Sequence, residues 1–289
     1  MTRLFGFTQF EFAGTIAVAD GRYVVRNDGG ERVLVLETLA APAPPRRRRR
    51  RAREAEAGTP RTTLPLARVT AVRASEPFSG EEEASRWLEE ASANEEAIDR
   101  LVAEGVGLLN LALHAHAVAS GDPHVQALTA RRAVAVRLGY GNGEEVASGE
   151  FSAALEVDAG TGAGTRRQQR AEELRPQERL AAVLGGRERL DVCETLILRA
   201  RSDLDAGRER EAALQLRVGL EALLAELGDA LADPGHEEDM ANLESRRHEA
   251  GEMANLALRG DLDAEQGKHV HDLVAICERV LRRRRVLRG

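Results

Sequence analysis

The 289-residue sequence has few aromatic residues, two cysteines and almost no lysine. Two cysteines without a CxxC pair or a cysteine–histidine cluster exclude a disulfide-rich secreted scaffold and predict no zinc site. No uninterrupted apolar stretch reaches the roughly 20 residues of a membrane span. The N-terminus shows neither the apolar core nor the cleavage site of a signal peptide. We therefore expect a soluble cytoplasmic protein without a membrane partner.

The remaining composition is that of a chain that folds. Hydrophobic residues make up 43% of the sequence, which is ordinary for a globular protein, and the length predicts one large domain or two to three small ones. Five of the nine aromatic residues lie within residues 1–23. We expect aromatic packing in the N-terminal part and a core of Leu, Val and Ala in the rest of the chain.

Charge is distributed unevenly, although the net charge is only −7. Residues 1–75 carry 14 arginines against 7 acidic residues, but six of these arginines form the single run Arg46–Arg51. Residues 76–278 carry a net charge of −20. The positive charge is thus a local run, whereas a nucleic-acid-binding domain normally has a basic surface.

The basic residues are nearly all arginine, since Lys268 is the only lysine among 41. Arginine codons are rich in G and C, so this ratio is typical of a GC-rich bacterial genome. An arginine excess of that origin gives little support to nucleic-acid binding.

Residues 3–39 predict β-strands joined by hairpin turns, because apolar, aromatic and β-branched residues alternate between turn-forming segments. The phenylalanines change parity between Phe7 and Phe10, which predicts a bulge or a strand that bends between two sheet faces. A Pro- and Arg-rich loop over 40–62 is expected to be disordered, and strand character resumes at Leu64–Ala74. The expected strand segments are Leu4–Phe12, Thr15–Val18, Tyr23–Val25 and Val33–Leu36, with turns at Asp20–Gly21 and Asn27–Gly30.

Residues 79–170 predict helices followed by a β-hairpin. Apolar residues recur every three or four positions over Glu81–Val118, with Ser79 as a candidate N-cap and a break near Ser92–Asn94 that makes two helices. The glycine-rich segment Gly139–Gly143 lies between two strand-like runs and predicts a hairpin turn. Residues 158–170 are rich in glycine and predict a flexible linker.

Residues 171–289 predict an antiparallel helical bundle, because four apolar stripes are separated by helix-stop segments. The predicted fold class is therefore α+β. A small N-terminal β domain, barrel-like or sheet-like, covers residues 1–78; helices with an inserted hairpin cover 79–170; and the bundle covers 171–289.

The segment Leu204–Leu214, with Gly207 in a turn and alanines at the start of the next helix, resembles part of a tetratricopeptide repeat. The resemblance covers about one repeat, residues 190–227, and nothing similar recurs one period later near Gly235–Leu243. It implies a helical hairpin that binds a peptide or a partner protein and carries no catalysis.

The histidines predict no metal site. His114 and His116 are two residues apart on a predicted helix and point to nearly opposite faces, so they cannot share a metal ion there. His248 has Glu244 and Glu252 four residues to either side, a spacing that can hold a divalent ion but is more typical of a solvated helix face.

The remaining candidate chemistries point to structure rather than catalysis. Cys193 and Cys277 each fall on an apolar stripe, which predicts buried and unreactive thiols. The glycine-rich segments Gly139–Gly143 and Gly160–Thr165 lack the glycine spacing and the lysine of phosphate-binding loops. We therefore predict no cofactor.

The sequence favours a non-catalytic cytoplasmic interaction or scaffold protein. The amphipathic helical region is expected to bind a protein partner or a second copy of the chain. The acidic residues over 76–278 can attract a basic partner or the protein's own run Arg46–Arg51.

Two alternatives remain at the level of the sequence. The first is a nucleic-acid-associated protein that uses the aromatic residues of the β domain and the loop arginines. The second is an enzyme with a site at the domain junction, around His114, Tyr140 and Asn142. The loop arginines are Arg46, Arg47, Arg48, Arg49, Arg50 and Arg51.

Overall fold

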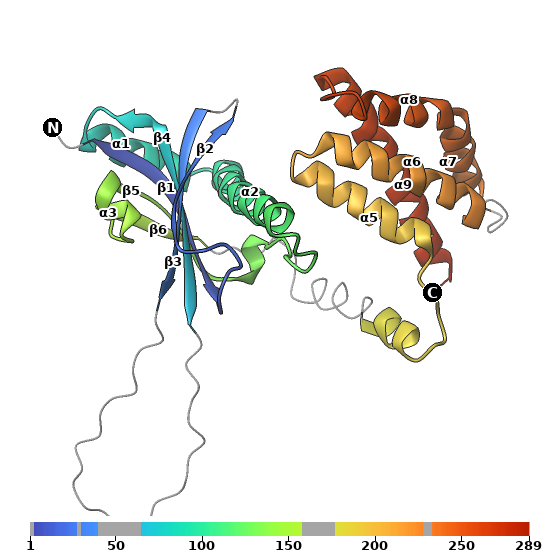
Figure 1. The fold of residues 1–289 in the computed structure, drawn as a ribbon, viewed down its shortest axis with the longest axis horizontal. Coiled ribbons are helices and arrows are strands. Elements are labelled where there is room, and N and C mark those ends of the chain that lie inside the picture. The colour runs from blue at the N-terminus through green and yellow to red at the C-terminus, as the bar shows by residue number, and fades with distance from the viewer. Residues whose placement is uncertain (1–2, 28–29, 40–64, 158–176, 228–232, 289) are drawn as a thin grey trace, which may run out of the picture. The chain divides into compact units, whose positions relative to one another are not determined.

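The computed structural model describes residues 3–27, 30–39, 65–157, 177–227 and 233–288. The fold is α+β, as the sequence predicts, and the chain divides into two compact units, Met1–Ala163 and Gly164–Gly289 (Figure 1). Arg46–Arg51 and the expected linker 158–170 lie outside the described residues.

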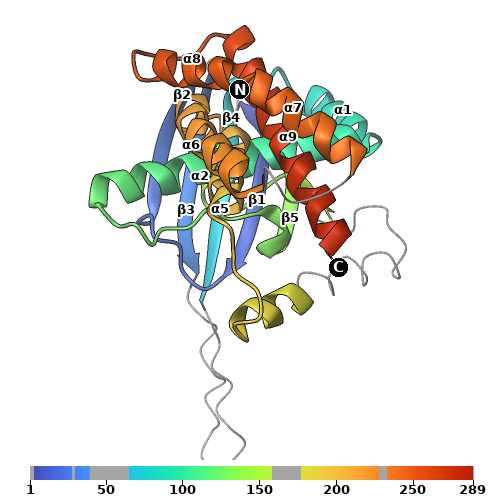
Figure 2. The ribbon, with the colours of Figure 1, turned by 90° about the vertical axis from the view of Figure 1, so that its right-hand side faces the viewer.

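The N-terminal unit is built on a six-stranded antiparallel sheet, whose central strands lie side by side in Figure 2. The strand order is β2-β3-β4-β1-β5-β6, so the sheet is open and the barrel-like alternative is not realised. The strands are β1 (Leu4–Ala13), β2 (Gly21–Asn27), β3 (Gly30–Leu39), β4 (Leu66–Phe78), β5 (Ala133–Asn142) and β6 (Ala153–Val157).

The first four strands follow most of the sequence pattern. β2 and β3 pair as a hairpin with Asn27 opposite Gly30, as the turn residues predict. β3 and β4 are antiparallel neighbours, so the loop over 40–62 is an insertion between two strands of one sheet. The expected strand at Thr15–Val18 is absent, because residues 14–20 form the irregular connection from β1 to β2.

Strand β5 shows why the structure divides the chain differently from the sequence prediction. β5 pairs with β1 from Leu4 opposite Asn142 to Phe12 opposite Ala133, and β6 pairs with β5. The described part of the expected middle domain 79–170, residues 79–157, therefore belongs to the N-terminal unit, and its strands β5 and β6 complete the sheet. Pairing between strands more than 100 residues apart leaves no local pattern in the sequence.

Two helices cover one face of the sheet, α1 (Glu81–Ser92) and α2 (Glu95–Ser120), and the break between them lies where the sequence predicts it. The Asn94 side chain caps α2 by accepting a hydrogen bond from the Ala97 N–H. Ser79 is not the N-cap of α1, a position that Gly80 takes. Instead, the Ser79 N–H donates to the Glu83 carboxylate at 2.7 Å.

The parity change in β1 has a simple cause, since both faces of the strand are covered. Phe10 belongs to the core beneath α2, where Leu109 is also fully buried. Phe7 points to the opposite face and packs in a smaller cluster with Val72 and Val146, a residue of α3 (Gly143–Ala147). A bulge between Phe5 and Phe7 in the β1–β4 pairing adds to this arrangement.

The turn predicted at Gly139–Gly143 is wrong, because Gly139 and Gly141 are strand residues of β5. A Cβ atom on Gly139 would lie 2.3 Å from the Ala153 carbonyl oxygen and 2.8 Å from Cζ of Phe7. Glycine is needed here because it has no Cβ, which allows the close approach of β6 and Phe7. Neither Gly139 nor Gly141 has a positive φ. The connection to β6 runs instead through α3.

By length and composition, α2 is the one helix among the described residues that is apolar enough to cross a membrane. Its inner side packs on the sheet of its own unit through Leu108, Leu109 and Leu113. A core helix of this kind passes the same test of length and composition, so the finding is weak support for a membrane span.

The C-terminal unit is helical throughout its regular structure, as the apolar stripes predict. The sequence carries helix-stop signals at Gly207, Asp233–Gly235 and Gly260–Asp261. Gly207 and Gly260–Asp261 separate helices, whereas Asp233–Gly235 begins one, because Asp233 caps the helix that starts at Pro234. The apolar stripe predicted from the sequence begins at Leu190, but Leu190 precedes the helix that starts at Val192 and is exposed. A helical stretch covers residues 177–184. The helices that follow it are α5 (Val192–Asp205), α6 (Glu209–Leu227), α7 (Pro234–Ser245), α8 (Arg247–Ala257) and α9 (Ala264–Arg288).

The arginine-rich end of α9 is bound within the unit. Arg279 and Arg283 both pair with the buried Asp239 of α7, at 2.8 and 3.1 Å. Arg284 pairs with Asp191, the N-cap of α5, at 2.6 Å. These arginines hold α9 against α7 and α5, so they are not a free cationic surface.

Candidate functional site

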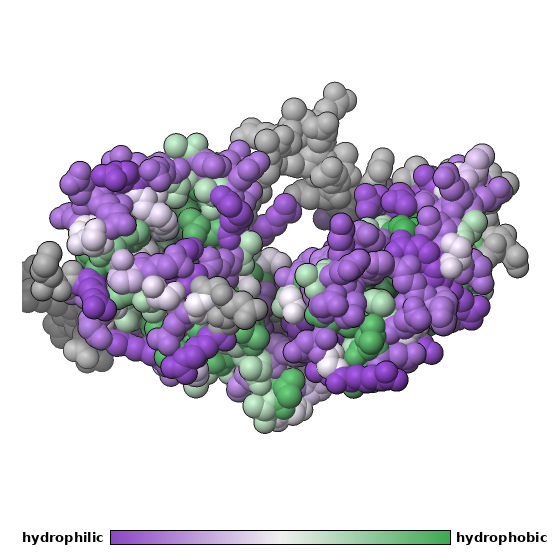
Figure 3. All heavy atoms as spheres, turned by 90° about the horizontal axis from the view of Figure 1, so that it is seen from above, coloured by the Kyte–Doolittle hydropathy of each residue, from purple (hydrophilic) through white to green (hydrophobic). Residues whose placement is uncertain are grey.

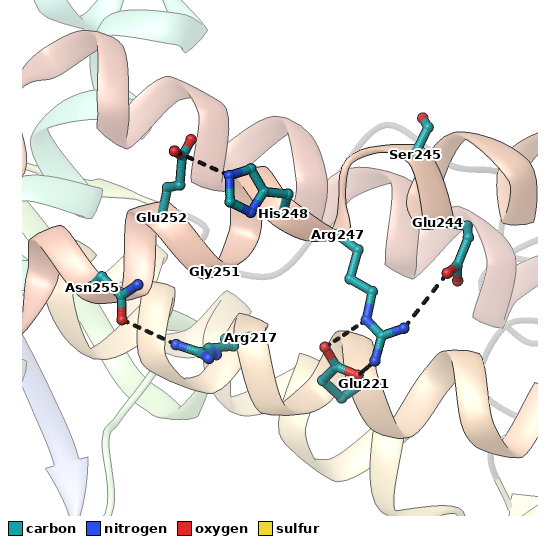
Figure 4. A pocket seen from close by; sticks show the side chains of 9 residues that line it. All are labelled: Arg217, Glu221, Glu244, Ser245, Arg247, His248, Gly251, Glu252 and Asn255. Carbon is teal, nitrogen blue, oxygen red and sulfur yellow. Dashed lines mark hydrogen bonds and ion pairs between the residues drawn. The ribbon is translucent and has the colours of Figure 1, made fainter.

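An open hollow of about 470 Å³ lies between α6 and α8 of the C-terminal unit (Figure 4). The two helices run antiparallel, because Arg210 near the start of α6 donates to the Ala257 carbonyl at the end of α8. We call this hollow the α6–α8 groove. It is lined by Arg217, Glu221, Glu244, Ser245, Arg247, His248, Gly251, Glu252 and Asn255.

Arg247 is the central cation of the α6–α8 groove and lies between two carboxylates (Figure 4). Its Nε donates to Glu221 at 2.8 Å, and its Nη1 lies 3.6 Å from Glu244. The hydrogen bonds from Arg247 lower the pKa of Glu221 below its usual range. Glu221 therefore remains an anion under physiological conditions.

Two further polar pairs extend along the groove. Arg217 donates to the Asn255 side chain at 3.1 Å, and His248 Nε2 lies 3.3 Å from Glu252. His248 is 89% exposed and Arg247 is 50% exposed. Ion pairs this exposed contribute only about 0–1 kcal/mol each, so their members can exchange one partner for another at little cost.

Exposed apolar side chains adjoin the charged lining. Leu214 and Val218 are neighbours four residues apart on α6, and Val218 directly follows Arg217. Leu258 is exposed just beyond Ala257, where Arg210 joins the two helices. Protein interfaces combine an apolar core with a polar rim, and exposed apolar side chains next to charged ones fit that arrangement. Elsewhere the visible surface of each unit is largely hydrophilic, with apolar residues in separate patches (Figure 3).

The spacing of Glu244, His248 and Glu252 does not make a metal site. The helix is interrupted at Arg246, between α7 and α8. Glu244 therefore does not lie one turn before His248 on a continuous helix. Glu244 pairs with Arg247 instead. No group of three or more His, Cys, Asp or Glu side chains in the described ranges could hold a metal ion.

Both cysteines are buried, as predicted, and burial raises the pKa of each thiol to about 12. For Cys193 the neighbouring Glu226 adds to this effect. The Glu226 carboxylate accepts hydrogen bonds from the N–H groups of Val192 and Cys193 at the start of α5. The sequence stripe gave no sign of this polar neighbour, because Glu226 comes from α6.

The three residues expected at a domain junction are all in the N-terminal unit and serve separate elements. His114 lies in the C-terminal half of α2. Tyr140 lies opposite Gly6 and lines a second hollow, which is formed with α1. Asn142 caps α3 by accepting a hydrogen bond from the Glu144 N–H. The three side chains therefore do not form one catalytic site.

Three of the four phenylalanines of β1 are not available for stacking bases, and the fourth, Phe5, is partly buried. Phe7, Phe10 and Phe12 are buried in the two cores of the sheet. Arg46–Arg51 lie outside the described residues, so their role in nucleic-acid binding stays a prediction.

Comparison of the chain with protein-family models, with curated proteins and with solved structures finds no match. A function for this protein is therefore argued from the sites themselves. The α6–α8 groove was missed in the sequence because its lining has only the ordinary pattern of an exposed helix face. Only the packing of α6 against α8 brings Arg217 and Glu221 next to Asn255 and Arg247.

Proposed function

We propose that this is a non-catalytic interaction protein whose C-terminal helical unit binds a partner protein along the α6–α8 groove. The observation that carries the proposal is the row of exposed, mutually paired charges in the groove beside exposed Leu214 and Val218. The resemblance of residues 190–227 to a tetratricopeptide hairpin favours the same function.

The lining of the groove indicates the chemistry of the partner. Three carboxylates, Glu221, Glu244 and Glu252, stand beside Arg217 and Arg247. A partner segment with alternating charges can replace the internal pairs, since a new pair restores what an opened one loses. Apolar side chains of the same segment can cover Val218 and Leu214, which supplies affinity that charge pairs alone do not.

A capture experiment with reversed charges tests the proposal. Full-length protein and the double variant Arg217→Glu/Arg247→Glu are used to capture partners from a bacterial lysate, with and without nuclease. The control variant Arg22→Glu alters an equally exposed ion pair in the N-terminal unit. We expect a protein partner that the control retains, that the groove variant loses, and whose binding to purified chain weakens at least tenfold in the groove variant.

Other outcomes assign the binding elsewhere. Capture that nuclease abolishes would support the nucleic-acid-associated alternative and contradict the proposal. A partner held equally by the groove variant would place the binding surface outside the α6–α8 groove. Concentration-dependent dimers of the purified chain, lost in the groove variant, would make a second copy the partner.

A further inference from the structure

A second open hollow of about 350 Å³ lies in the N-terminal unit between α1 and the end of β5. We call it the α1 hollow. It lies in a different unit from the α6–α8 groove, so the inference drawn from it goes beyond the proposed function and does not depend on it. Its lining is Glu81, Glu82, Ser85, Arg86, Glu89 and Tyr140.

The lining that α1 contributes is acidic. Glu81, Ser85 and Glu89 are spaced four residues apart, so they follow one side of the helix. At a rise of about 1.5 Å per residue, the two carboxylate-bearing positions are about 12 Å apart. The single cation, Arg86, is paired with Glu82 at 3.4 Å, and both of these side chains are mainly exposed. Two carboxylates of the hollow are thus left without a cation of their own in the lining.

Tyr140 supplies a second and independent observation. Its side chain is only 4% exposed, and its ring packs edge-on against Phe78 with centroids 6.5 Å apart. It stands opposite Gly6 on the sheet face that α1 covers, so the hydroxyl, at the tip of the side chain, is the part that reaches α1. The hydroxyl makes no hydrogen bond to any residue in the described part of the chain. The hydroxyl is not among the fully buried side-chain atoms that lack a partner, so it opens to the hollow. A ligand in the hollow can there replace water as its hydrogen-bond partner.

We propose that the α1 hollow binds an organic cation that bears an alkylammonium or guanidinium group. One N–H of the cation donates to the Tyr140 hydroxyl, and the charge is balanced by Glu81 and Glu89. The spacing of the two carboxylates suits a linear polyamine in which two of the charged nitrogens each face one carboxylate. A lysine or arginine side chain of a partner peptide carries the same chemistry.

Titration of the full-length protein with spermidine at low salt tests the proposal. Heat is measured by calorimetry, and fluorescence of Trp87, the only tryptophan of the chain, reports from the neighbourhood of Arg86 on α1. We expect saturable binding to one site that weakens as salt is added, because exposed charges are screened. Tyr140→Phe keeps the ring and removes the hydroxyl, and we expect an affinity loss of about tenfold, typical of one hydrogen bond to a charged group.

A carboxylate variant and a matched control make the test independent of the folding of Tyr140→Phe. Glu81→Gln/Glu89→Gln removes two exposed carboxylates from the hollow, and we expect it to weaken binding about tenfold or more. Glu95→Gln/Glu96→Gln removes two exposed carboxylates from the first turn of α2, outside the hollow, and we expect less than a twofold change.

Three results would overturn the proposal. The first is the absence of saturable spermidine binding at low salt. The second is an equal loss of affinity in the control variant Glu95→Gln/Glu96→Gln and the hollow variant Glu81→Gln/Glu89→Gln. The third is full affinity in a folded Tyr140→Phe protein. Two further arms identify the source of the cation. Tighter binding of spermidine than of capped Gly-Lys-Gly and Gly-Arg-Gly peptides supports a free polyamine, whereas tighter binding of a peptide that spermidine displaces supports a basic side chain of a partner.

Discussion

Replacing Gly139 by alanine is the most direct test of the packing of the N-terminal sheet. The added Cβ would lie 2.3 Å from the Ala153 carbonyl oxygen, 2.9 Å from Cα of Ala154 and 2.8 Å from Cζ of Phe7. Two of these neighbours are backbone atoms of the hydrogen-bonded strand β6 and cannot rotate away. Because Phe7 is also fully buried, we expect a loss near the upper end of the usual overpacking cost, about 3 kcal/mol.

The same substitution at Gly107 is the matched control, because it should have the opposite sign. Gly107 lies on α2, and no atom lies within 4 Å of the position that its Cβ would take. Alanine there should stabilise the helix by about 0.5–1 kcal/mol, through the lower conformational entropy of the unfolded chain.

Urea unfolding followed by Trp87 fluorescence measures both effects. The only tryptophan of the chain lies in the N-terminal unit, so the signal reports the unfolding of that unit. With a denaturant slope of roughly 2 kcal/mol per molar urea, Gly139→Ala should lower the midpoint by about 1.5 M. Gly107→Ala should raise it by about 0.3 M. An unchanged midpoint for Gly139→Ala, or an equal decrease in both variants, would refute the steric argument.

Three further predictions concern the C-terminal unit. Asp239→Asn should destabilise this unit by about 1–3 kcal/mol, because Arg279 and Arg283 lose their shared carboxylate while remaining half-exposed. Urea unfolding followed by circular dichroism measures the loss. The control variant Arg282→Ala, on the exposed side of α9, should change the stability little. Hydrogen bonding to Arg246, with a smaller effect of His269, lowers the pKa of Glu249 to about 2, against about 4.3 in an unfolded chain. The stability that it contributes is therefore complete above about pH 5 and lost as the pH falls toward 2, and Glu249→Gln should flatten the dependence of the urea midpoint on pH in this range; an unaltered pH profile would show that the Arg246–Glu249 pair is not the cause. Cys193 and Cys277 should resist a thiol reagent at pH 8 in the native protein and react only after denaturation; rapid labelling of the native chain would contradict their burial.

Local patterns in the sequence were sufficient for most of the elements. The helix break before Glu95, the hairpin closed by Asn27 and Gly30, and the helices of the C-terminal unit all follow from apolar spacing and turn residues. These features depend on contacts between residues close in the chain, which is why periodicity and capping rules detect them.

The sequence-based predictions failed where the structure at a residue is determined by a contact with a residue distant in the sequence. Gly139 lies in a glycine-rich segment typical of a turn, but it is a strand residue. Glycine is required there because Phe7 and β6 leave no room for a side chain. Arg284 lies in an arginine-rich run near the end of the sequence, and the run itself gives no sign that Arg284 pairs with Asp191 of α5. In both cases the deciding partner is more than 90 residues away or on another strand, and no local pattern contains it.

The sequence by itself determined the α+β class, the helical character of the C-terminal half and the burial of both cysteines, because each follows from residue type and spacing along the chain. Only the tertiary structure decided that β5 completes the N-terminal sheet and that Arg217 and Glu221 meet Asn255 and Arg247 across the α6–α8 groove. It also decided that Tyr140 lies beneath the carboxylates of α1. Both candidate sites combine side chains from elements that are separate in the sequence, so their chemistry exists only once those elements have packed.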